Sequence, residues 1–382
     1  MKNGRITLVM LWVKSSGNIT SVNDLVLRLD KERFNVIFIF LSGQPADKDP
    51  LKEKGYEVFY LKDSGWLEGF NFAVLSRLIK ILKKCSPDII HCHGHKATVY
   101  GSLASNFVKI PVVMAHVHGL DRSRYLRRKF ANLFLFRKVH RILCVAESVR
   151  NDVLKNNWLL SPDKVSVLEN SVEYERFADG TISKTDAKKI LALPAESYVF
   201  GTIARFGPYK GHSFLISAIK IVKSKIPTAH LVLIGEGPLK EDVQHQIDTD
   251  GLAQFVHLFS QRNDIPNVLR AMDAFVLPST GSEGMPRVLL EVMAADVPYI
   301  TTTVGGNPEI INTPDIGFLV QPKDQDALAQ AMTIVAQMPG EKLVTLTEKA
   351  RQRVRQNYSH QVVSHKLGEI YEDELSRSRK KD

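Results

Sequence analysis

The sequence predicts an α/β protein built from two Rossmann-like domains, each with a parallel sheet, that face each other across a cleft. Two observations support this prediction. Short apolar runs typical of buried strands alternate with helical patterns almost from end to end, which favours parallel sheets covered by helices. The alternation also starts a second time after a polar stretch at 177–197, and a chain of 382 residues is long enough for two separate cores.

The first domain is expected at residues 1–176. Its first strand is expected at 5–13, where Lys2 and Arg5 precede an apolar stretch and so imitate a signal peptide, but no small-residue cleavage site comes after it. A buried first strand is therefore the preferred interpretation. Helical patterns are expected at 22–32 and 72–84. The further strand-like segments are 34–41, 56–61, 87–94, 111–119, 141–147 and 164–170.

The second domain is expected at 177–357. It opens with the polar stretch 177–197, which is typical of a linker with a short helix. From about Gly340 onward the chain is expected to be helical, and the apolar spacing of 358–382 suits a helix that packs back on the first domain. The strand-like segments of the second domain are 198–205, 229–237, 255–260, 273–279, 298–306 and 317–322.

Composition limits where the protein can act. A content of 44% hydrophobic and 24% charged residues is ordinary for a soluble enzyme. No apolar run approaches the ~18 residues that a membrane span needs. Cys85, Cys92 and Cys144 lie in or beside apolar segments without paired spacing, so we expect reduced core residues. The predicted location is the cytoplasm, with peripheral attachment to the inner face of the cytoplasmic membrane as an option.

Two carboxylates stand at the start of one predicted helix. Glu283 lies in a glycine-flanked turn after a buried strand, and Glu291 lies in the helix that Pro286 is suited to begin. Helical side chains lean toward the N-terminus, so Glu291 points back toward that turn. Free N–H groups at a helix start suit an anion and carboxylates suit hydroxyl groups, which together describe a sugar nucleotide. The alternative is a capping acid and a partly exposed helix residue.

Two cations occupy a similar position earlier in the same domain. Arg205 ends a strand, and Lys210 stands just before the next helix. Arginine offers a planar fork and lysine a compact charge, and strand-to-helix turns bind phosphate well in α/β sheets. The pair could neutralise a diphosphate. The alternative is that both are solvated surface cations.

Together these stretches resemble the retaining glycosyltransferases of the GT-B type, family four, which use nucleotide-activated sugars. The resemblance spans nearly the whole chain. Its motifs are the E-x7-E pair Glu283 and Glu291, the R-x4-K pair Arg205 and Lys210, "LVLIGEGP" at 231–238, "GGNPEII" at 305–311, "DIIHCHG" at 88–94, "HG" at 118–119 and "ENSVEYERF" at 169–177.

The resemblance implies a role for each matching residue. Arg205 and Lys210 would bind the donor diphosphate and stabilise it as the leaving group, so no metal or other cofactor is expected. Glu291 would hold the ribose hydroxyls, and Glu283 would grip hydroxyls of the transferred sugar. The further residues implied in donor binding are Gly17, Gly235, Arg262 beside the base, Gly284, Met285 and Pro286.

In the first domain, the resemblance implies that His118 faces the transferred sugar. His93 and His95, in "HCHGH", are expected to help bind the acceptor. Alternating histidines also suggest a metal site, but no second ligand cluster with zinc spacing is present, so no metal is assigned. A packed core histidine is the other alternative.

Three further features weigh on the interpretation. The family commonly has paired glycines after the first strand, where this chain has only Gly17, and its usual Asn-Gly at the domain crossing is Asn170-Ser171 here. The "DTD" at 248–250 imitates a metal motif of other transferases. It ends a helical run before Gly251, so we interpret it as a helix end on the surface.

A net charge of +10 favours an anionic partner, either nucleic acid, a phosphorylated substrate or an acidic membrane. The segment 121–141 is rich in Arg and Lys, interleaved with aromatic residues. This pattern is typical of a helix that lies on an anionic membrane surface, and relatives that act on lipid-linked acceptors fit it. An ordinary amphipathic helix with a solvated basic face is the alternative.

The favoured function is transfer of a hexose-type sugar from a UDP- or GDP-sugar to a glycan or glycolipid acceptor, with retention at the anomeric carbon. Bacterial lipopolysaccharide or surface polysaccharide assembly is the expected setting. Two other hypotheses stay open. One is a GT-B relative such as a sugar-nucleotide epimerase or a phosphorylase, and the other is a protein that only binds a membrane or nucleic acid. No nucleic-acid-binding module is recognisable in the sequence.

Overall fold

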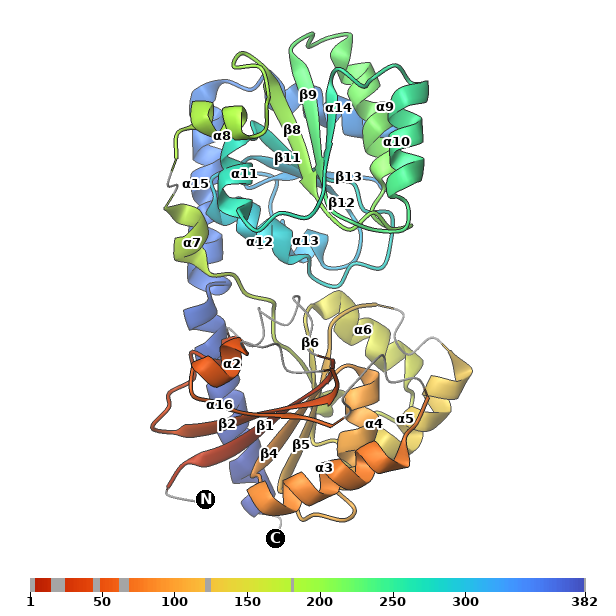
Figure 1. Cartoon of the computed structure of the whole chain (residues 1–382), viewed down its shortest axis with the longest axis vertical. Helices are drawn as coiled ribbons and strands as arrows, with labels where there is room; N and C mark the ends of the chain where they lie inside the picture. The colour runs from red at the N-terminus through yellow and green to blue at the C-terminus, as the bar shows by residue number, and fades with distance from the viewer. Residues whose placement is uncertain are drawn as a thin grey trace. The chain divides into compact units, whose positions relative to one another are not determined.

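The structure is a computed structural model, and it describes residues 4–14, 25–43, 49–61, 69–120, 125–179 and 182–380. The chain forms two compact units, shown in Figure 1. Unit 1 comprises residues 1–169 and 360–382, and unit 2 comprises residues 170–359. The boundary expected after residue 176 therefore moves to residue 169. The reason is local, because Asn170 donates to the Met285 carbonyl at 2.6 Å and Val172 to the Tyr358 carbonyl at 2.9 Å, both within unit 2.

Unit 1 is built on a seven-stranded parallel sheet with the strand order β3-β2-β1-β4-β5-β6-β7. The expected first strand is confirmed as a buried, central one, since Leu8, Val9 and Met10 are fully buried. The strands are β1 (Ile6–Lys14), β2 (Phe34–Ser42), β3 (Glu57–Tyr60), β4 (Ile89–His93), β5 (Val112–Val117), β6 (Arg141–Cys144) and β7 (Val165–Val167).

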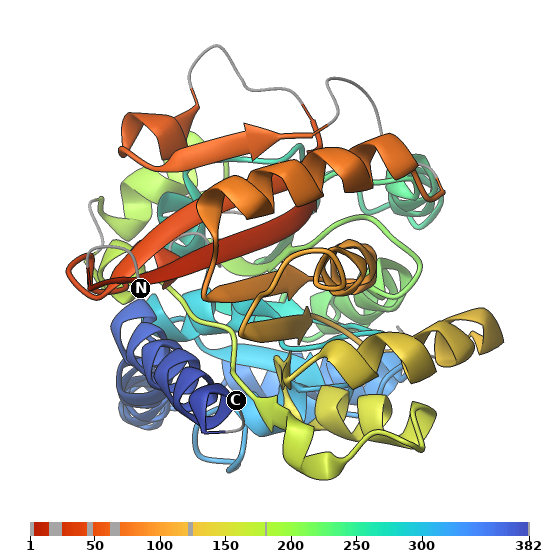
Figure 2. The ribbon, with the colours of Figure 1, turned by 90° about the horizontal axis from the view of Figure 1, so that it is seen from below.

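Helices cover both faces of this sheet. The C-terminal helix α16 (His360–Arg379) buries Val363, Leu367 and Tyr371 against one face, in a cluster that includes Met10. On the other face α4 (His95–Ala104) packs so closely that a Cβ on Gly101 would lie 2.4 Å from Cys92 Sγ. Figure 2 shows α16 in dark blue beside the sheet. The other helices are α2 (Pro50–Glu53), α3 (Phe72–Cys85), α5 (Leu126–Lys138) and α6 (Glu147–Asn156), with a short 3-10 turn at Pro162–Lys164.

Unit 2 has a six-stranded parallel sheet with the order β10-β9-β8-β11-β12-β13. Its strands are β8 (Tyr198–Ile203), β9 (Ala229–Ile234), β10 (Val256–Phe259), β11 (Ala274–Leu277), β12 (Tyr299–Thr302) and β13 (Phe318–Val320). Its helices are α7 (Tyr174–Ala178), α8 (Lys184–Ile190), α9 (His212–Lys223), α10 (Lys240–Thr249), α11 (Ile265–Ala271), α12 (Arg287–Ala294), α13 (Asn307–Ile310), α14 (Gln325–Ala336) and α15 (Gly340–Asn357).

Most of the expected elements are confirmed. Every predicted strand segment contains a strand, and the helices at 72–84, within 177–197 and beyond Gly340 are present. The helix expected at 22–32 differs, because only Leu25 and Val26 of its described part are helical, and turns follow. All three cysteines are buried, and no two of them form a disulfide. Among the described residues, no helix combines the length and the apolar character that a membrane span requires.

Candidate functional site

Three loops at the carboxyl ends of the unit 2 strands pack backbone against backbone. Gly211, which precedes α9, has φ +69°, and a Cβ there would lie 1.9 Å from the Pro278 carbonyl oxygen after β11. Gly305, after β12, has φ +57°, and its Cβ would lie 1.9 Å from the carbonyl oxygen of Glu283. Only glycine combines a positive φ with such a close approach. The loops that carry Lys210 and Glu283 are therefore held in fixed positions by the main chain.

Lys210 and Glu283 meet at this place. The Lys210 Nζ donates to Glu283 Oε1 at 2.5 Å, and the hydroxyl of Ser279 donates to the same oxygen. Glu283 is buried and Lys210 half-buried. A buried carboxylate is stabilised by such a cation and hydroxyl, and Lys210 in turn is oriented by a rigid acceptor. The sequence predicted both residues at the site, and the structure brings them into direct contact.

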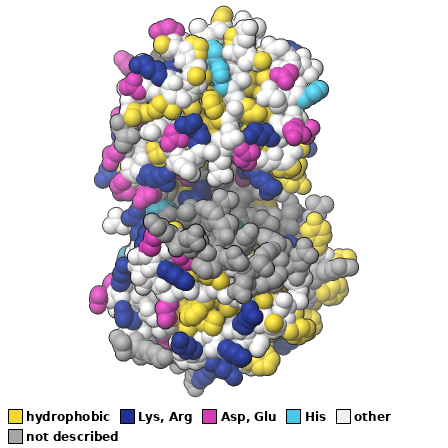
Figure 3. All heavy atoms as spheres, viewed as in Figure 1, with side chains coloured by type: hydrophobic (Ala, Val, Ile, Leu, Met, Phe, Trp, Pro, Cys, Tyr) yellow, Lys and Arg dark blue, Asp and Glu magenta, His cyan; other side chains and the backbone are white. Residues whose placement is uncertain are grey.

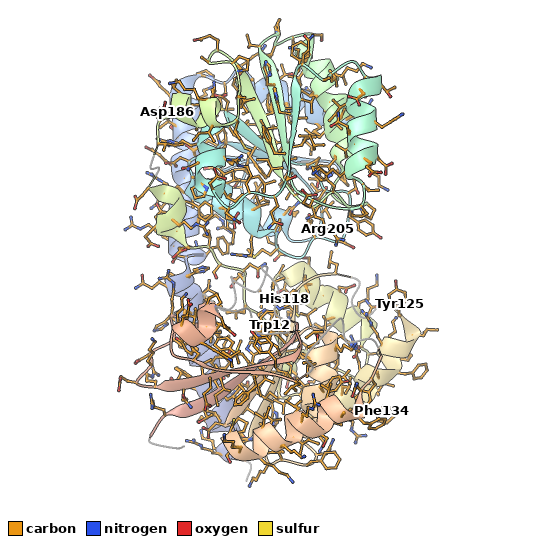
Figure 4. All side chains as sticks on the ribbon, in the orientation of Figure 1. Trp12, His118, Tyr125, Phe134, Asp186 and Arg205 are labelled. Carbon is orange, nitrogen blue, oxygen red and sulfur yellow. The ribbon has the colours of Figure 1, made fainter. Side chains whose placement is uncertain are left out.

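Arg205 lies two residues beyond β8 and is exposed. It makes no hydrogen bond or ion pair with any residue in the described parts of the chain. Its loop is held by the loop after β9, because a Cβ on Gly235 would lie 2.0 Å from the Ala204 carbonyl oxygen and Phe206 donates to the Glu236 carbonyl at 3.0 Å. Figure 4 labels Arg205 near the strand ends of unit 2. A fixed backbone thus presents an unpaired guanidinium, which suits a phosphate.

Glu291 lies in the second turn of α12 and is half-buried. Burial raises the pKa of its carboxyl group, although Arg287 and Arg176 favour the charged form. Within the described residues its carboxylate has neither a hydrogen bond nor an ion pair. Burying a carboxylate without a partner costs free energy, and hydroxyl donors from a ligand would satisfy it. The binding of ribose hydroxyls by Glu291 stays a prediction.

The loop between Glu283 and α12 is fixed through its main chain. The Gly284 carbonyl accepts from Gly306 at 2.8 Å, and the Met285 carbonyl accepts from Asn170 Nδ2 at 2.6 Å. Pro286 is the N-cap residue of α12, one position before the first helical turn where it was expected. Arg262, expected beside the base, forms a two-bond pair with Asp264 at 2.8 and 2.7 Å.

A stack of aromatic and imidazole rings fills the strand ends of unit 1. His93 on β4 lies beside His116 on β5 in the sheet register. Trp12 stacks on His93 with ring centroids 4.0 Å apart, and His116 stacks on His118 at 4.3 Å. His93 Nδ1 lies 3.1 Å from His118 Nε2, so one of the two nitrogens donates to the other. Figure 4 labels Trp12 and His118 at this end of unit 1.

These buried histidines are held in the neutral form. Burial and the charge of His118 lower the pKa of His91 to about 3, and burial with neighbouring histidines lowers the pKa of His93 and His116 well below the usual value. His91, His93 and His116 each offer a ring nitrogen within 4.8 Å of the others, the one such group among the described residues. The sequence pattern could not show this trio, because His116 joins it only through the pairing of β4 with β5.

His118 and His95 line a cavity of about 290 Å³ in unit 1. His95 opens α4, and its Nε2 lies 3.2 Å from Asn132 Oδ1 on α5. Burial and the charge of Arg128 lower the pKa of His95, and the bond to Asn132 partly offsets this. His93 does not line this cavity, and it is linked to the lining residue His118 by the 3.1 Å contact between their rings. Gly17 lies outside the described residues.

Comparisons with known proteins identify the family of this chain. The model described as Glycosyltransferase Family 4 matches residues 17–176, and that described as Glycosyl transferases group 1 matches residues 183–353. The UDP-Gal:alpha-D-GlcNAc-diphosphoundecaprenol alpha-1,3-galactosyltransferase of Escherichia coli is 34% identical over 271 residues, which cover 68% of this chain and 69% of that protein. The chain belongs to the group 1 glycosyltransferases.

Other relatives of this glycosyltransferase support the same family and fold. The capsular polysaccharide biosynthesis glycosyltransferase CapM of Staphylococcus aureus is 27% identical over 323 residues, covering 80% of this chain and 81% of that protein. A glycosyltransferase structure from Rickettsia africae matches with a TM-score of 0.85 at 21% identity, over 97% of this chain and 99% of that one. The structure of Anabaena HepE in complex with UDP matches with a TM-score of 0.83 at 19% identity, over 96% and 100%. The glycosyltransferase therefore has the expected GT-B fold.

Three residues of the glycosyltransferase site escaped the sequence prediction. Ser279 shares the Glu283 oxygen with Lys210, Asn170 holds the Met285 carbonyl, and Arg176 acts on Glu291 while donating to the Asn263 carbonyl at 3.3 Å. Ser279 lies only four residues before Glu283, so a polar residue at the end of a buried strand was a usable signal. Asn170 and Arg176 belong to the motif at 169–177, but nothing in the sequence showed that they act on the Met285 carbonyl and on Glu291. The "DTD" at 248–250 is the end of α10, as expected, with Asp250 paired to Lys220 at 2.7 Å.

Proposed function

We propose that this glycosyltransferase moves a sugar from a UDP-sugar to a lipid-linked glycan in the assembly of a bacterial surface polysaccharide or lipopolysaccharide. The Escherichia coli relative is named for UDP-Gal as donor and a sugar on diphosphoundecaprenol as acceptor, which supports this choice of substrates. A GDP-sugar donor is the alternative in the same class. The observation that carries the proposal is the placement of Arg205, Lys210 and Glu283 in loops at the strand ends of unit 2, with Glu291 on helix α12 that follows the loop of Glu283.

The donor would bind at unit 2 through complementary chemistry. Arg205, which has no partner among the described residues, and Lys210 would neutralise the diphosphate. Glu291 would accept hydrogen bonds from the ribose hydroxyls, and Glu283, with the main chain of Gly284 and Met285, from the transferred sugar. Because these two cations stabilise the leaving group, we propose that the reaction requires no metal ion.

Transfer is proposed to proceed with retention at the anomeric carbon. The bond from that carbon to the diphosphate oxygen breaks, and a bond to the acceptor hydroxyl oxygen forms on the same face of the sugar. The leaving diphosphate takes the hydroxyl proton, so atoms and charges balance without a side-chain base. Holding the reactants and stabilising the leaving group are then the contributions of the protein.

Unit 1 is proposed to supply the acceptor side. The cavity lined by His118 and His95 contains polar groups that can bind sugar hydroxyls. Tyr125, which precedes α5, and Leu126, Phe130 and Phe134 on the helix are exposed in a basic segment. We propose that this face lies on an anionic membrane surface. Residues 121–124 of the predicted basic segment lie outside the described residues.

The test is a donor panel with purified protein. Release of the nucleotide from UDP-, GDP- and ADP-sugars is measured with and without a lipid-diphosphate sugar acceptor, in the presence of EDTA. A UDP-sugar is expected to be consumed, and the anomeric configuration of the product is read by NMR. Arg205→Ala is the sharpest variant, because no contact within the described chain depends on this side chain.

Removing one such leaving-group contact is expected to lower kcat about a hundredfold or more. Arg270→Ala, which removes an exposed arginine on α11 of the same unit, is the control and should leave kcat unchanged. Glu291→Gln should mainly raise KM for the donor. Equal rates for the wild type and Arg205→Ala would reject the proposed donor site, and an inverted product would reject retention.

A further inference from the structure

Two cavities of unit 1 adjoin at the end of α5. The first, of about 490 Å³, lies where the chain enters β5, β6 and β7, beside the end of α16. The second, of about 430 Å³, lies between α5 and the segment that follows α6. Arg137 and Lys164 line both cavities, so the two adjoin at these residues. We call them the cationic cavity and the apolar cavity.

The cationic cavity has an excess of positive charge. Its charged lining residues are the cations Lys109, Arg137, Arg141, Lys164 and Arg377 and the acids Asp163 and Glu374. Two of these cations already have a carboxylate partner, since Arg141 Nε donates to Glu374 Oε1 at 2.8 Å and Arg377 Nε donates to Asp373 Oδ1 at 3.1 Å. The charge that remains favours an anion with several acceptor oxygens, and a phosphate group is the commonest of these.

Arg137 is the cation best placed for such an anion. It lies in the last turn of α5 and is exposed, and its side chain has no hydrogen bond or ion pair within the described residues. Lys164 is committed to the end of the same helix, where its Nζ donates to the Val139 carbonyl at 3.0 Å. That hydrogen bond pairs Lys164 with a carbonyl at the C-terminus of α5. Arg137 is therefore the cation that can bind a ligand.

The apolar cavity has the opposite character. Leu133, Phe134, Phe136, Leu159 and Leu160 contribute most of its lining. At its mouth Phe134 is 71% exposed and Leu159 is 82% exposed, and the neighbouring Trp158 is 81% exposed. Figure 4 shows Phe134 at the outer edge of unit 1, and Figure 3 shows yellow side chains gathered along that edge. Large apolar groups in water are unfavourable, and tryptophan beside a basic surface is typical of the membrane interface.

We propose that the two cavities together bind one anionic phospholipid of the bilayer surface. The phosphate occupies the cationic cavity, an acyl chain enters the apolar cavity, and Phe134, Trp158 and Leu159 insert into the interface. The proposal builds on the membrane contact of the proposed function, and it adds a defined lipid site to a generally basic surface. A site of this kind needs both the phosphate and the chain, which separates it from simple electrostatic attraction.

The test is binding of the full-length protein to vesicles. Co-sedimentation is measured with vesicles of phosphatidylcholine alone and of phosphatidylcholine with phosphatidylglycerol. We expect binding to the anionic vesicles only. Arg137→Ala should weaken it at least about fivefold, because this variant loses the charge-assisted hydrogen bonds to the phosphate as well as one positive charge. Lys138→Ala, the neighbouring exposed cation that lines neither cavity, should change it less than about twofold.

The apolar half is tested with Leu159→Asp, which should abolish binding, against Ile334→Asp, an exposed residue of unit 2 that should not affect it. Inorganic phosphate should displace no more protein than chloride at equal ionic strength. Equal losses for Arg137→Ala and Lys138→Ala, or displacement by free phosphate, would overturn the lipid site. Hydrolysis of the sugar nucleotide without acceptor should be the same for Arg137→Ala and wild type, so a failed lipid site is distinguishable from a failed donor site.

Discussion

Acidification is expected to destabilise unit 1 through its buried histidines. His91 is fully buried, and burial with the charge of His118 lowers its pKa to about 3. In an unfolded chain the same side chain has a pKa of about 6.5. Between these values only the unfolded chain binds the proton, so the stabilisation is complete above the unfolded pKa and is lost as pH falls toward the folded pKa.

The size of this effect follows from the two pKa values. At about pH 5, protonation favours the unfolded chain by RT ln(1 + 10^1.5), or about 2 kcal/mol, for His91 alone. A domain has only about 5–15 kcal/mol of stability. Burial and the neighbouring histidines lower the pKa values of His93 and His116 as well, so both act in the same direction as His91.

Urea unfolding at about pH 7 and about pH 5 measures the effect. The three tryptophans of the chain, at 12, 66 and 158, all belong to unit 1, so their fluorescence reports on that unit. His91→Asn removes the titrating ring but keeps a polar group for the hydroxyl of Tyr371, which lies 2.7 Å from His91 Nδ1. We expect the variant to lose about 2 kcal/mol less than wild type between the two pH values.

His365→Asn is the matched control, because this histidine on α16 has a side chain that is 74% exposed. Its pH dependence should equal that of the wild type. If His91→Asn loses as much stability on acidification as wild type does, then His91 is not held neutral in the folded protein and the reasoning is refuted.

Two further predictions concern unit 2. Gly211→Ala should lower the stability of unit 2 by about 1–3 kcal/mol, because φ is +69° at this residue and the new Cβ would clash with the Pro278 carbonyl. Gly340→Ala is the control and should be neutral, since its Cβ would meet no atom within 4 Å. Equal Tm values for the two variants would contradict this prediction. Asn170→Ala should raise KM for the donor, because the Met285 carbonyl loses the hydrogen bond that Asn170 donates at 2.6 Å. Asn357→Ala, which removes a similar hydrogen bond to a carbonyl within α15, should leave KM unchanged. Unchanged steady-state kinetics for Asn170→Ala would contradict the prediction.

The parts of the fold that the sequence predicted are those with strong local signals. Buried parallel strands such as β4 and β11 appear in the sequence as short apolar runs, because both faces of such a strand are covered by helices. The helix expected at 22–32 had apolar periodicity too, yet beyond Val26 its described part forms turns before β2. Periodicity alone does not decide where a helix ends.

The candidate site also has a part that the sequence predicted and a part that it did not. Lys210 and Glu283 were predictable because each belongs to a motif with fixed spacing at a strand end, although nothing local showed that they bond to each other. The trio of His91, His93 and His116 was only partly visible, because "HCHGH" supplies two members and the register of β4 with β5 supplies the third. Contacts made across a sheet depend on strand order, which a single sequence does not reveal.

The contact between Lys210 and Glu283 also determines how the proposed donor would bind. Lys210 already has a carboxylate partner at 2.5 Å, and Glu283 is buried, so a diphosphate cannot take the lysine away without leaving an unpaired buried charge. Sharing is the favourable alternative, in which Lys210 bridges the carboxylate and a phosphate oxygen. Arg205 has no hydrogen-bond or ion-pair partner within the described chain, so its guanidinium can donate two parallel hydrogen bonds to the diphosphate. Of the two cations, Arg205 should therefore contribute more to donor affinity, and Lys210 more to the position of the transferred sugar.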